Sequence, residues 1–251
     1  MTARRPLLAV VAALLAWAAL PRVAAAQTKA DAFAGKIPPV SGQLFRKAGR
    51  LELGLGGDVS INDAFFTKYF GGLELAYHLT ESFALSLHGA GGFTTATGSA
   101  VVCSAKTGCS DASEVQMRQV PGRIRGLAAL GVAWSPVYGK LNVLAEKVAH
   151  FDLAVLGGVD FVAHDEVLSR AHALVLEAEG ADPKLTTTYG FHVGLGARLF
   201  LYESMAVRLV VKDLVYAVKV PNNGGADDWQ NQLFTEIGVS FFFPTRNRPQ
   251  R

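Results

Sequence analysis

The amino-acid sequence predicts an all-β protein, an eight-stranded antiparallel up-and-down transmembrane β-barrel. From residue 50 onward, large apolar residues alternate with small or polar ones, which is the period of β-strands. The connections between these segments are alternately short and long, as in outer-membrane barrels. Mean hydropathy is +0.26, yet beyond the N-terminal segment no run reaches the ~18 apolar residues that a membrane helix needs. The apolar residues must therefore lie on strands rather than on a membrane helix.

The chain begins with a segment typical of exported proteins. Arg4 and Arg5 precede an apolar stretch that ends in three alanines at 24–26. This pattern predicts a secretory signal peptide over residues 1–26, and the apolar run is short for the alternative, an uncleaved anchor. The predicted mature chain has a periplasmic leader, a single barrel domain and a short polar tail, over residues 27–49, 50–243 and 244–251.

The charge balance changes when the signal peptide is removed. The formal charge of +3 comes entirely from Arg4, Arg5 and Arg22, since no acidic residue precedes Asp31. Removing these three bases from the 24 of the chain leaves 21, equal to its 21 acidic residues. A neutral mature chain lacks the basic surface of nucleic-acid-binding proteins, so we exclude that class.

The first three predicted strands cover 50–60, 69–79 and 83–93, and their apolar faces carry Leu51, Leu53, Leu55, Leu73, Leu75, Leu85 and Leu87. The next three cover 125–135, 150–161 and 189–201, with Leu153, Val155, Val159, Phe191, Val193 and Leu195 on the apolar face of the last two. The last two cover 205–216 and 233–243, with Val207, Leu209, Val211, Ile237, Val239 and Phe241. Asp213 interrupts the apolar face, which places it near the outer interface or at a bulge.

Three predicted connections are short: 80–82, 202–204, and 135–139 followed by an ambiguous segment. That segment, 140–149, either extends the fifth strand or forms a short helical turn. The other connections are long, around 62–68, 95–122, 163–186 and 219–231. Residues 167–180 have helical composition and predict a surface helix within one long loop.

The faces opposite the apolar residues combine glycine and alanine with both signs of charge. A face open to water has no reason to be so small, whereas a narrow lumen favours small residues and paired charges, and eight strands enclose little more than their own side chains. We predict that the apolar face meets lipid; a soluble lipocalin-like barrel or sandwich is the alternative. The predicted lumen network comprises Glu52, Glu74, His88, Asp152, Asp160, His192, Arg198, Arg208, Lys212 and Glu236.

Aromatic residues gather near the predicted strand ends, where membrane barrels carry interfacial girdles. The predicted girdle comprises Tyr77, Phe83, Trp134, Tyr138, Phe151, Tyr202, Tyr216 and Phe243. Five residues separate Cys103 from Cys109, and in an exported protein this spacing predicts a local disulfide rather than a metal site.

Several stretches resemble a family of small outer-membrane β-barrel proteins of myxobacteria and related delta-proteobacteria. The resemblance is strongest at SINDAFFTKYFG, YHLTE and WSPVYGKL, and it covers nearly the whole mature chain. It implies a signal peptide, one barrel domain, an outer-membrane location and no catalytic residues. One departure is that PTRNRPQR follows Phe243, where barrels of this kind often end on an aromatic residue.

These patterns predict a non-enzymatic protein with a structural or interaction-anchor role in the cell envelope, and without cofactor or metal. A small channel or transporter is the main alternative. A lipid-modifying enzyme using Glu74, Ser86 and His88 is a further one, and Asp227 with Asp228 would offer ligands for calcium. The expected partners are outer-membrane lipid, the barrel assembly machinery and periplasmic or surface proteins.

Overall fold

A computed structural model describes residues 45–61, 63–104, 108–143, 147–221 and 226–244. The predicted signal peptide, most of the predicted leader and most of the tail lie outside these residues. No helix in this part of the chain is long and apolar enough to cross a membrane.

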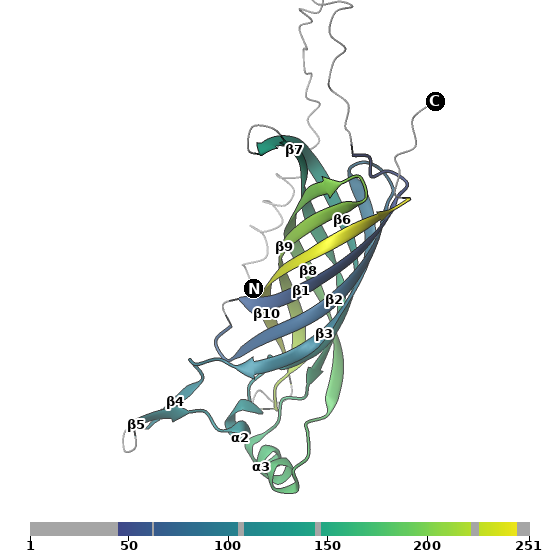
Figure 1. Ribbon diagram of the computed structural model, residues 1–251. Coiled ribbons are helices and arrows are strands. Elements are labelled where there is room, and N and C mark those ends of the chain that lie inside the picture. The colour runs from purple at the N-terminus through teal and green to yellow at the C-terminus, as the bar shows by residue number, and fades with distance from the viewer. Residues whose placement is uncertain (1–44, 62, 105–107, 144–146, 222–225, 245–251) are drawn as a thin grey trace, which may run out of the picture. The chain divides into compact units, whose positions relative to one another are not determined.

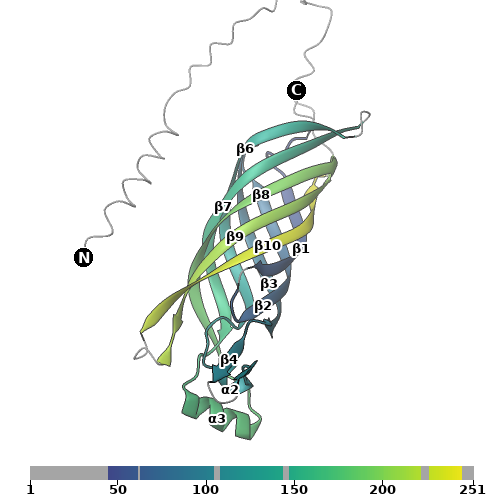
Figure 2. The ribbon, with the colours of Figure 1, turned by 90° about the vertical axis from the view of Figure 1, so that its left-hand side faces the viewer.

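Eight long strands form a closed barrel in the order β1-β10-β9-β8-β7-β6-β3-β2. Every neighbouring pair is antiparallel, and Figures 1 and 2 show the barrel from two sides. The predicted fold class is confirmed. The strands are Leu51–Ile61 (β1), Phe66–His78 (β2), Phe83–Ala96 (β3), Ile124–Val143 (β6), Lys147–Asp165 (β7), Leu185–Tyr202 (β8), Met205–Lys219 (β9) and Asp227–Phe243 (β10).

The prediction of a turn at 135–139 is wrong, because β6 continues through these residues. The pairing of β6 with β7 shifts register between Trp134 and Val137 and then runs on to the pair Val143 and Lys147. Pro136 lies inside this shift, which is where a strand can hold a residue without an amide hydrogen. The ambiguous segment 140–149 is therefore divided between β6 and β7, apart from residues 144–146, which are outside the described chain.

The connections define two ends of the barrel. The short-turn end holds the turns at 79–82 and 203–204, and the long-loop end holds the connections 97–123 and 166–184. The predicted surface helix is confirmed as α3 (Arg170–Glu179), which begins after an N-cap at Ser169 and ends at Gly180 in the left-handed conformation (φ 64°).

The connection 97–123 contains two elements that the sequence analysis missed. One is the hairpin of β4 (Val101–Ser104) and β5 (Gly108–Asp111), whose opposed Cys103 and Cys109 form the predicted disulfide. The other is the short helix α2 (Glu114–Met117). The Arg123 guanidinium lies 2.7 Å from the Glu114 carboxylate and lowers its pKa by hydrogen bonding, which ties α2 to the start of β6.

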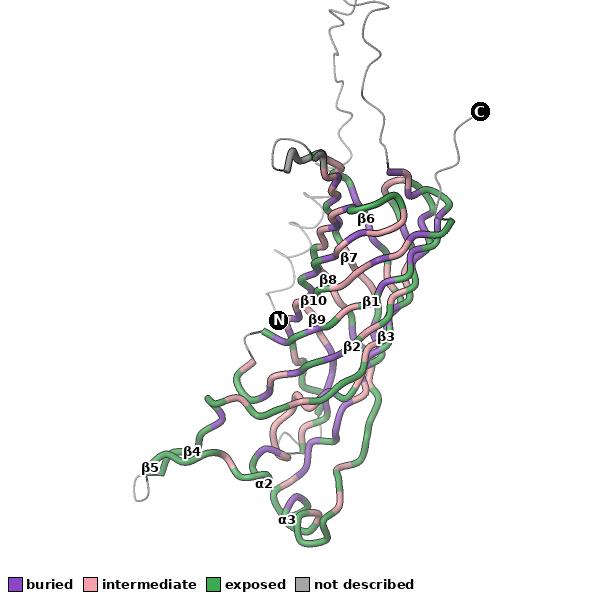
Figure 3. Tube along the Cα trace, viewed as in Figure 1, coloured by how far each residue is buried: buried purple, intermediate pink, exposed green. Residues whose placement is uncertain are grey.

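The outward faces of the strands form an apolar belt around the barrel. Buried and exposed residues alternate along the strands in Figure 3. The exposed members include Leu195, which is 66% exposed, and Leu73, which is 56% exposed. Asp213 lies in regular register between Val193 and Leu233, so the bulge proposed for it is wrong. Such a belt on a closed barrel suits hydrocarbon, where all backbone polar groups need partners within the protein.

Most of the predicted aromatic girdle lies on this outward face. Phe83 and Trp134 stack across neighbouring strands with ring centroids 6.3 Å apart. Exposed aromatic side chains at the short-turn end are Tyr77, Phe83, Trp134, Tyr202 and Phe243.

For two residues of the predicted girdle the prediction is wrong, because their side chains face the lumen. Tyr216 is only 1% exposed, because it shares the inward face of β9 with Arg208 and Lys212. Tyr138 packs against the buried Phe200, because the register shift after Trp134 reverses which residues of β6 face inward.

We predict that Leu195→Arg destabilises the protein in lipid vesicles by about 2–4 kcal/mol, because the charge would lie near the middle of the apolar belt. The matched control is Leu174→Arg, at a leucine of α3 that is also exposed but lies beyond the barrel. We expect that change to cost less than about 0.5 kcal/mol. Denaturant titration followed by the heat-modifiable gel shift measures both. Equal effects would contradict the placement of the belt in lipid.

Candidate functional site

The interior of the barrel holds long charged side chains opposite glycines. A Cβ atom at Gly54 would lie 2.9 Å from Nη1 of Arg208, and one at Gly72 would lie 2.9 Å from Nε2 of His88. Real Cβ atoms do not approach other atoms so closely. These glycines of β1 and β2 are therefore the space into which the opposing side chains extend.

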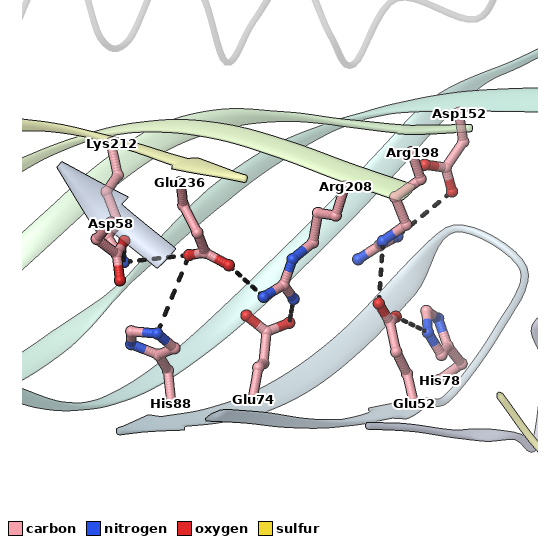
Figure 4. Close-up of polar contacts among 10 residues, drawn as sticks. All are labelled: Glu52, Asp58, Glu74, His78, His88, Asp152, Arg198, Arg208, Lys212 and Glu236. Carbon is pink, nitrogen blue, oxygen red and sulfur yellow. Dashed lines mark hydrogen bonds and ion pairs between the residues drawn. The ribbon is translucent and has the colours of Figure 1, made fainter. Parts of the chain in front are cut away.

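One group of charges lies toward the short-turn end (Figure 4). Arg198 of β8 lies between two carboxylates, 3.3 Å from Glu52 and 3.3 Å from Asp152. Asp152 also lies 2.5 Å from Nζ of Lys47, and Glu52 lies 2.8 Å from Nε2 of His78. Glu52 and Asp152 are fully buried, so each charge has an opposite partner where water cannot supply one.

A second group continues toward the long-loop end. Arg208 of β9 contacts Glu236, and its Nη1 lies 2.7 Å from Glu74. Lys212, four residues further along β9, lies 3.4 Å from Glu236 and 3.1 Å from Asp58. Glu236 thereby joins the two cations of β9, and Figure 4 shows the five side chains as one chain of contacts. Together the two groups form what we call the charge ladder: Lys47, Glu52, Asp58, Glu74, His78, Asp152, Arg198, Arg208, Lys212 and Glu236.

His88 and His192, the two histidines of the predicted lumen network, lie beside this ladder. Nδ1 of His192 lies 2.7 Å from Asp160, which forms a separate pair between β8 and β7. Nε2 of His88 lies 4.0 Å from Glu236. The structure thus places all ten predicted lumen residues inside the barrel.

The predicted lumen network lacks three members of the ladder. Asp58 and His78 occupy inward positions of β1 and β2, so their parity in the alternation offered a signal for both. Lys47 offered none, because it falls in the predicted leader and precedes the first strand.

Among the described residues, the polar side chains of the interior form neither a catalytic set nor a free metal site. Glu74 pairs with Arg208 rather than His88, and the cavity that Glu74, Ser86 and His88 share is about 30 Å³, the size of one water molecule. Ligand atoms of Asp58, His88 and Glu236 lie within 4.8 Å of one another. Lys212, however, already supplies a positive charge to both carboxylates, and a metal ion would have to displace it.

Apolar clusters fill both ends of the lumen, although the predicted inward faces combined glycine and alanine with both signs of charge. At the short-turn end Phe45 stacks on Phe200, with ring centroids 4.0 Å apart, beside Phe242. At the long-loop end a larger cluster contains Phe70, Ile124, Leu127, Val162, Val167, Leu214, Tyr216, Val218 and Phe234. The ladder is therefore enclosed between two apolar layers.

No protein-family model matches the chain, and no curated protein matches it. Membership of the family named above therefore stays a prediction. Among solved structures, the chain is similar to the N-terminal β-barrel domain of Pseudomonas aeruginosa OprF, at 11% identity over 78% of this chain and 98% of that one (TM-score 0.46). It is also similar to OprG of Pseudomonas aeruginosa, at 15% identity over 80% and 98% (TM-score 0.42), and to Neisserial surface protein A, at 7% identity over 77% and 94% (TM-score 0.38).

We predict that Arg198→Met lowers the free energy of unfolding by about 3–5 kcal/mol, because it removes a shared cation from two buried carboxylates. Arg123→Met is the matched control. The Arg123 side chain also forms an ion pair, 2.7 Å from Glu114, but the carboxylate that is left behind is 46% exposed, so the loss should cost less than about 1 kcal/mol. Urea titration of the folded protein in detergent compares the two. A small effect of Arg198→Met would mean that water reaches Glu52 and Asp152.

Proposed function

We propose that this protein is a non-enzymatic outer-membrane β-barrel with a structural or interaction-anchor role in the cell envelope. The observation that carries the proposal is the filled interior. Inside the described barrel, the cavities next to the charge ladder measure about 30 Å³ and 10 Å³. Neither cavity has room for more than about one water molecule.

The same observation weighs against the channel alternative. Conduction needs a continuous path for water and ions, whereas here cations and carboxylates meet across the lumen at 2.7–3.4 Å. Each side chain is held by partners on other strands, and the apolar clusters lie above and below. An ion would have to break several buried pairs in turn, each of which is costly to separate.

The outside of the barrel supports the proposed location and partners. The apolar belt would contact outer-membrane lipid, and a signal peptide would bring the chain to the barrel assembly machinery. The long loops, with α2, α3 and the disulfide-linked hairpin, offer the surface on which surface proteins would dock. The short-turn end would face proteins of the periplasm.

We predict that the purified wild-type protein gives no unit conductance in a planar lipid bilayer. The physical reason is the closed lumen, so the result should hold in either polarity of the applied voltage. A wide porin inserted into the same bilayer serves as positive control, and the heat-modifiable gel shift verifies that the sample is folded. Reproducible single-channel steps from the wild type would contradict the structural role and favour the channel.

The orientation gives a second prediction. Trypsin added to intact cells should cut after Lys184, which is exposed in the connection before β8, and not after Lys140, which is exposed near the short-turn end. Lys184→Gln should remove the fragment. After the outer membrane is permeabilised, the site at Lys140 should become accessible. Cleavage at Lys140 in intact cells would reverse the orientation.

A further inference from the structure

Polar side chains gather at one place on the outward face of the barrel. Outside the first and last three residues of each of the eight strands, the other outward positions of the described barrel are apolar, aromatic or glycine. The exceptions are Asp213 on β9 and Asn231 and Thr235 on β10, which we call the polar patch. β9 and β10 are neighbours in the wall (Figure 2).

The three side chains of the polar patch lie close to one another. Leu233 of β10 is directly opposite Asp213, and Asn231 and Thr235 are two residues to either side of Leu233. Diagonal neighbours of this kind on two paired strands are roughly 7 Å apart. A single docked surface therefore reaches all three.

The polar patch has no partner within the described part of the chain. Oδ1 of Asp213 is covered by its surroundings and accepts no hydrogen bond. Thr235 is half-buried and Asn231 is exposed, and neither side chain pairs with another described residue. Water would solvate such groups, but in hydrocarbon an unpaired polar group is costly. The patch therefore points to a partner that supplies hydrogen bonds.

The polar patch lies too deep for lipid headgroups. Along β9, Asp213 is eight residues beyond Met205 and four before Ala217, whose neighbour on β10 is the exposed Trp229. Exposed tryptophans of this kind mark the membrane interface. At about 3.3 Å per residue and a tilt of about 45°, four residues correspond to roughly 9 Å of depth. Acyl chains offer no hydrogen bonds there, so the partner is a polypeptide.

A second copy of the chain carries the groups that the polar patch needs. A carboxyl group accepts hydrogen bonds, while amide and hydroxyl groups both donate and accept them. The set is therefore complementary to itself, as a two-fold contact between identical subunits requires. Two copies inserted in the same direction present each residue at equal depth. A strand tilt of about 45° also places one of the two β10 residues at nearly the depth of Asp213.

We propose that the polar patch is the centre of a contact between two copies of this barrel, packed side by side in the membrane through β9 and β10. Asp213 of each copy accepts hydrogen bonds from Asn231 or Thr235 of the other. Apolar side chains around the patch complete the contact, including Val193 and Ile237, which are 58% and 64% exposed. The contact rests on the outer-membrane location proposed above, but not on the role of the barrel as an anchor.

The test measures the association of the full-length mature chain in phospholipid vesicles. Two pools, labelled enzymatically at the C-terminus with a donor or an acceptor dye, are reconstituted together over a range of protein-to-lipid ratios. We expect energy transfer that rises with this ratio and saturates as for a dimer. The heat-modifiable gel shift verifies folding in each sample. A chain that folds and inserts, but shows no energy transfer above that of random proximity, overturns the proposal and leaves the proposed location intact.

Substitutions of Asp213 test the hydrogen bonds. Asp213→Leu removes the carboxyl group and should weaken association roughly tenfold, because polar side chains contribute to contacts inside a membrane. Asp213→Asn keeps an oxygen that accepts hydrogen bonds and should associate within about threefold of the wild type. Neither change adds a charge to the lipid-facing wall, so both variants should fold. Equal association of Asp213→Leu and the wild type would exclude the polar patch as the centre of the contact.

The position of the contact is tested by placing the same large residue on opposite walls. Thr235→Trp puts an indole ring in the middle of the proposed contact and should abolish the energy transfer. Leu85→Trp is the matched control, because Leu85 is 49% exposed on β3, the strand opposite β9 in the ring. This variant should associate as the wild type does. If the two tryptophan variants behave alike, any dimer uses another face and the proposal fails.

Discussion

Backbone amide and carbonyl groups in hydrocarbon find hydrogen-bond partners only within the protein, and this constraint governs the whole architecture. β1 must meet β10, and the two pair from Leu51 with Phe243 to Ile61 with Leu233. Once the sheet is closed, every strand has one face toward lipid and one toward the lumen. Eight strands enclose so little space that side chains fill it, and the contents of the lumen follow from that closure.

In this interior, single charged side chains pair with two opposite charges at once. Arg198 serves two carboxylates, and Glu236 serves two cations. Buried pairs of this kind contribute little net stability over apolar packing, but removing one partner is costly. The ladder therefore fixes which strands lie opposite one another more than it adds to the free energy of folding. Glycines such as Gly54 are part of the same arrangement, because they leave room for the arginine.

The strands and most of their inward faces could be predicted from the sequence, because large apolar residues alternate with small or polar ones along most of each strand that has lipid on one side. Asp152 and Arg198 could be placed in the lumen from parity alone. Tyr138 could not, since a single register shift at Pro136 reverses parity and leaves no mark in composition. Tyr216 was misplaced for another reason: its position at a strand end suggested an interface, although its parity with Lys212 indicated the interior.

Contacts between segments that lie far apart in the sequence could not be predicted from it either. The pairing of Lys47 with Asp152 joins residues 105 positions apart, and no periodicity links them. The unequal extent of the strands likewise depends on three-dimensional pairing, since β10 pairs with β9 from Asp227 but with β1 only from Leu233.

Lys47 and Phe45 also give the barrel a mechanical property. Both precede β1, yet the lysine reaches a fully buried carboxylate and the phenylalanine stacks between strands at the short-turn end. A pull on the chain at residue 45 would thus act first on an ion pair and an aromatic stack inside the barrel, and only then on the hydrogen bonds of β1. Tension applied at residue 45 would therefore reach the wall of the barrel only after these interior contacts had broken.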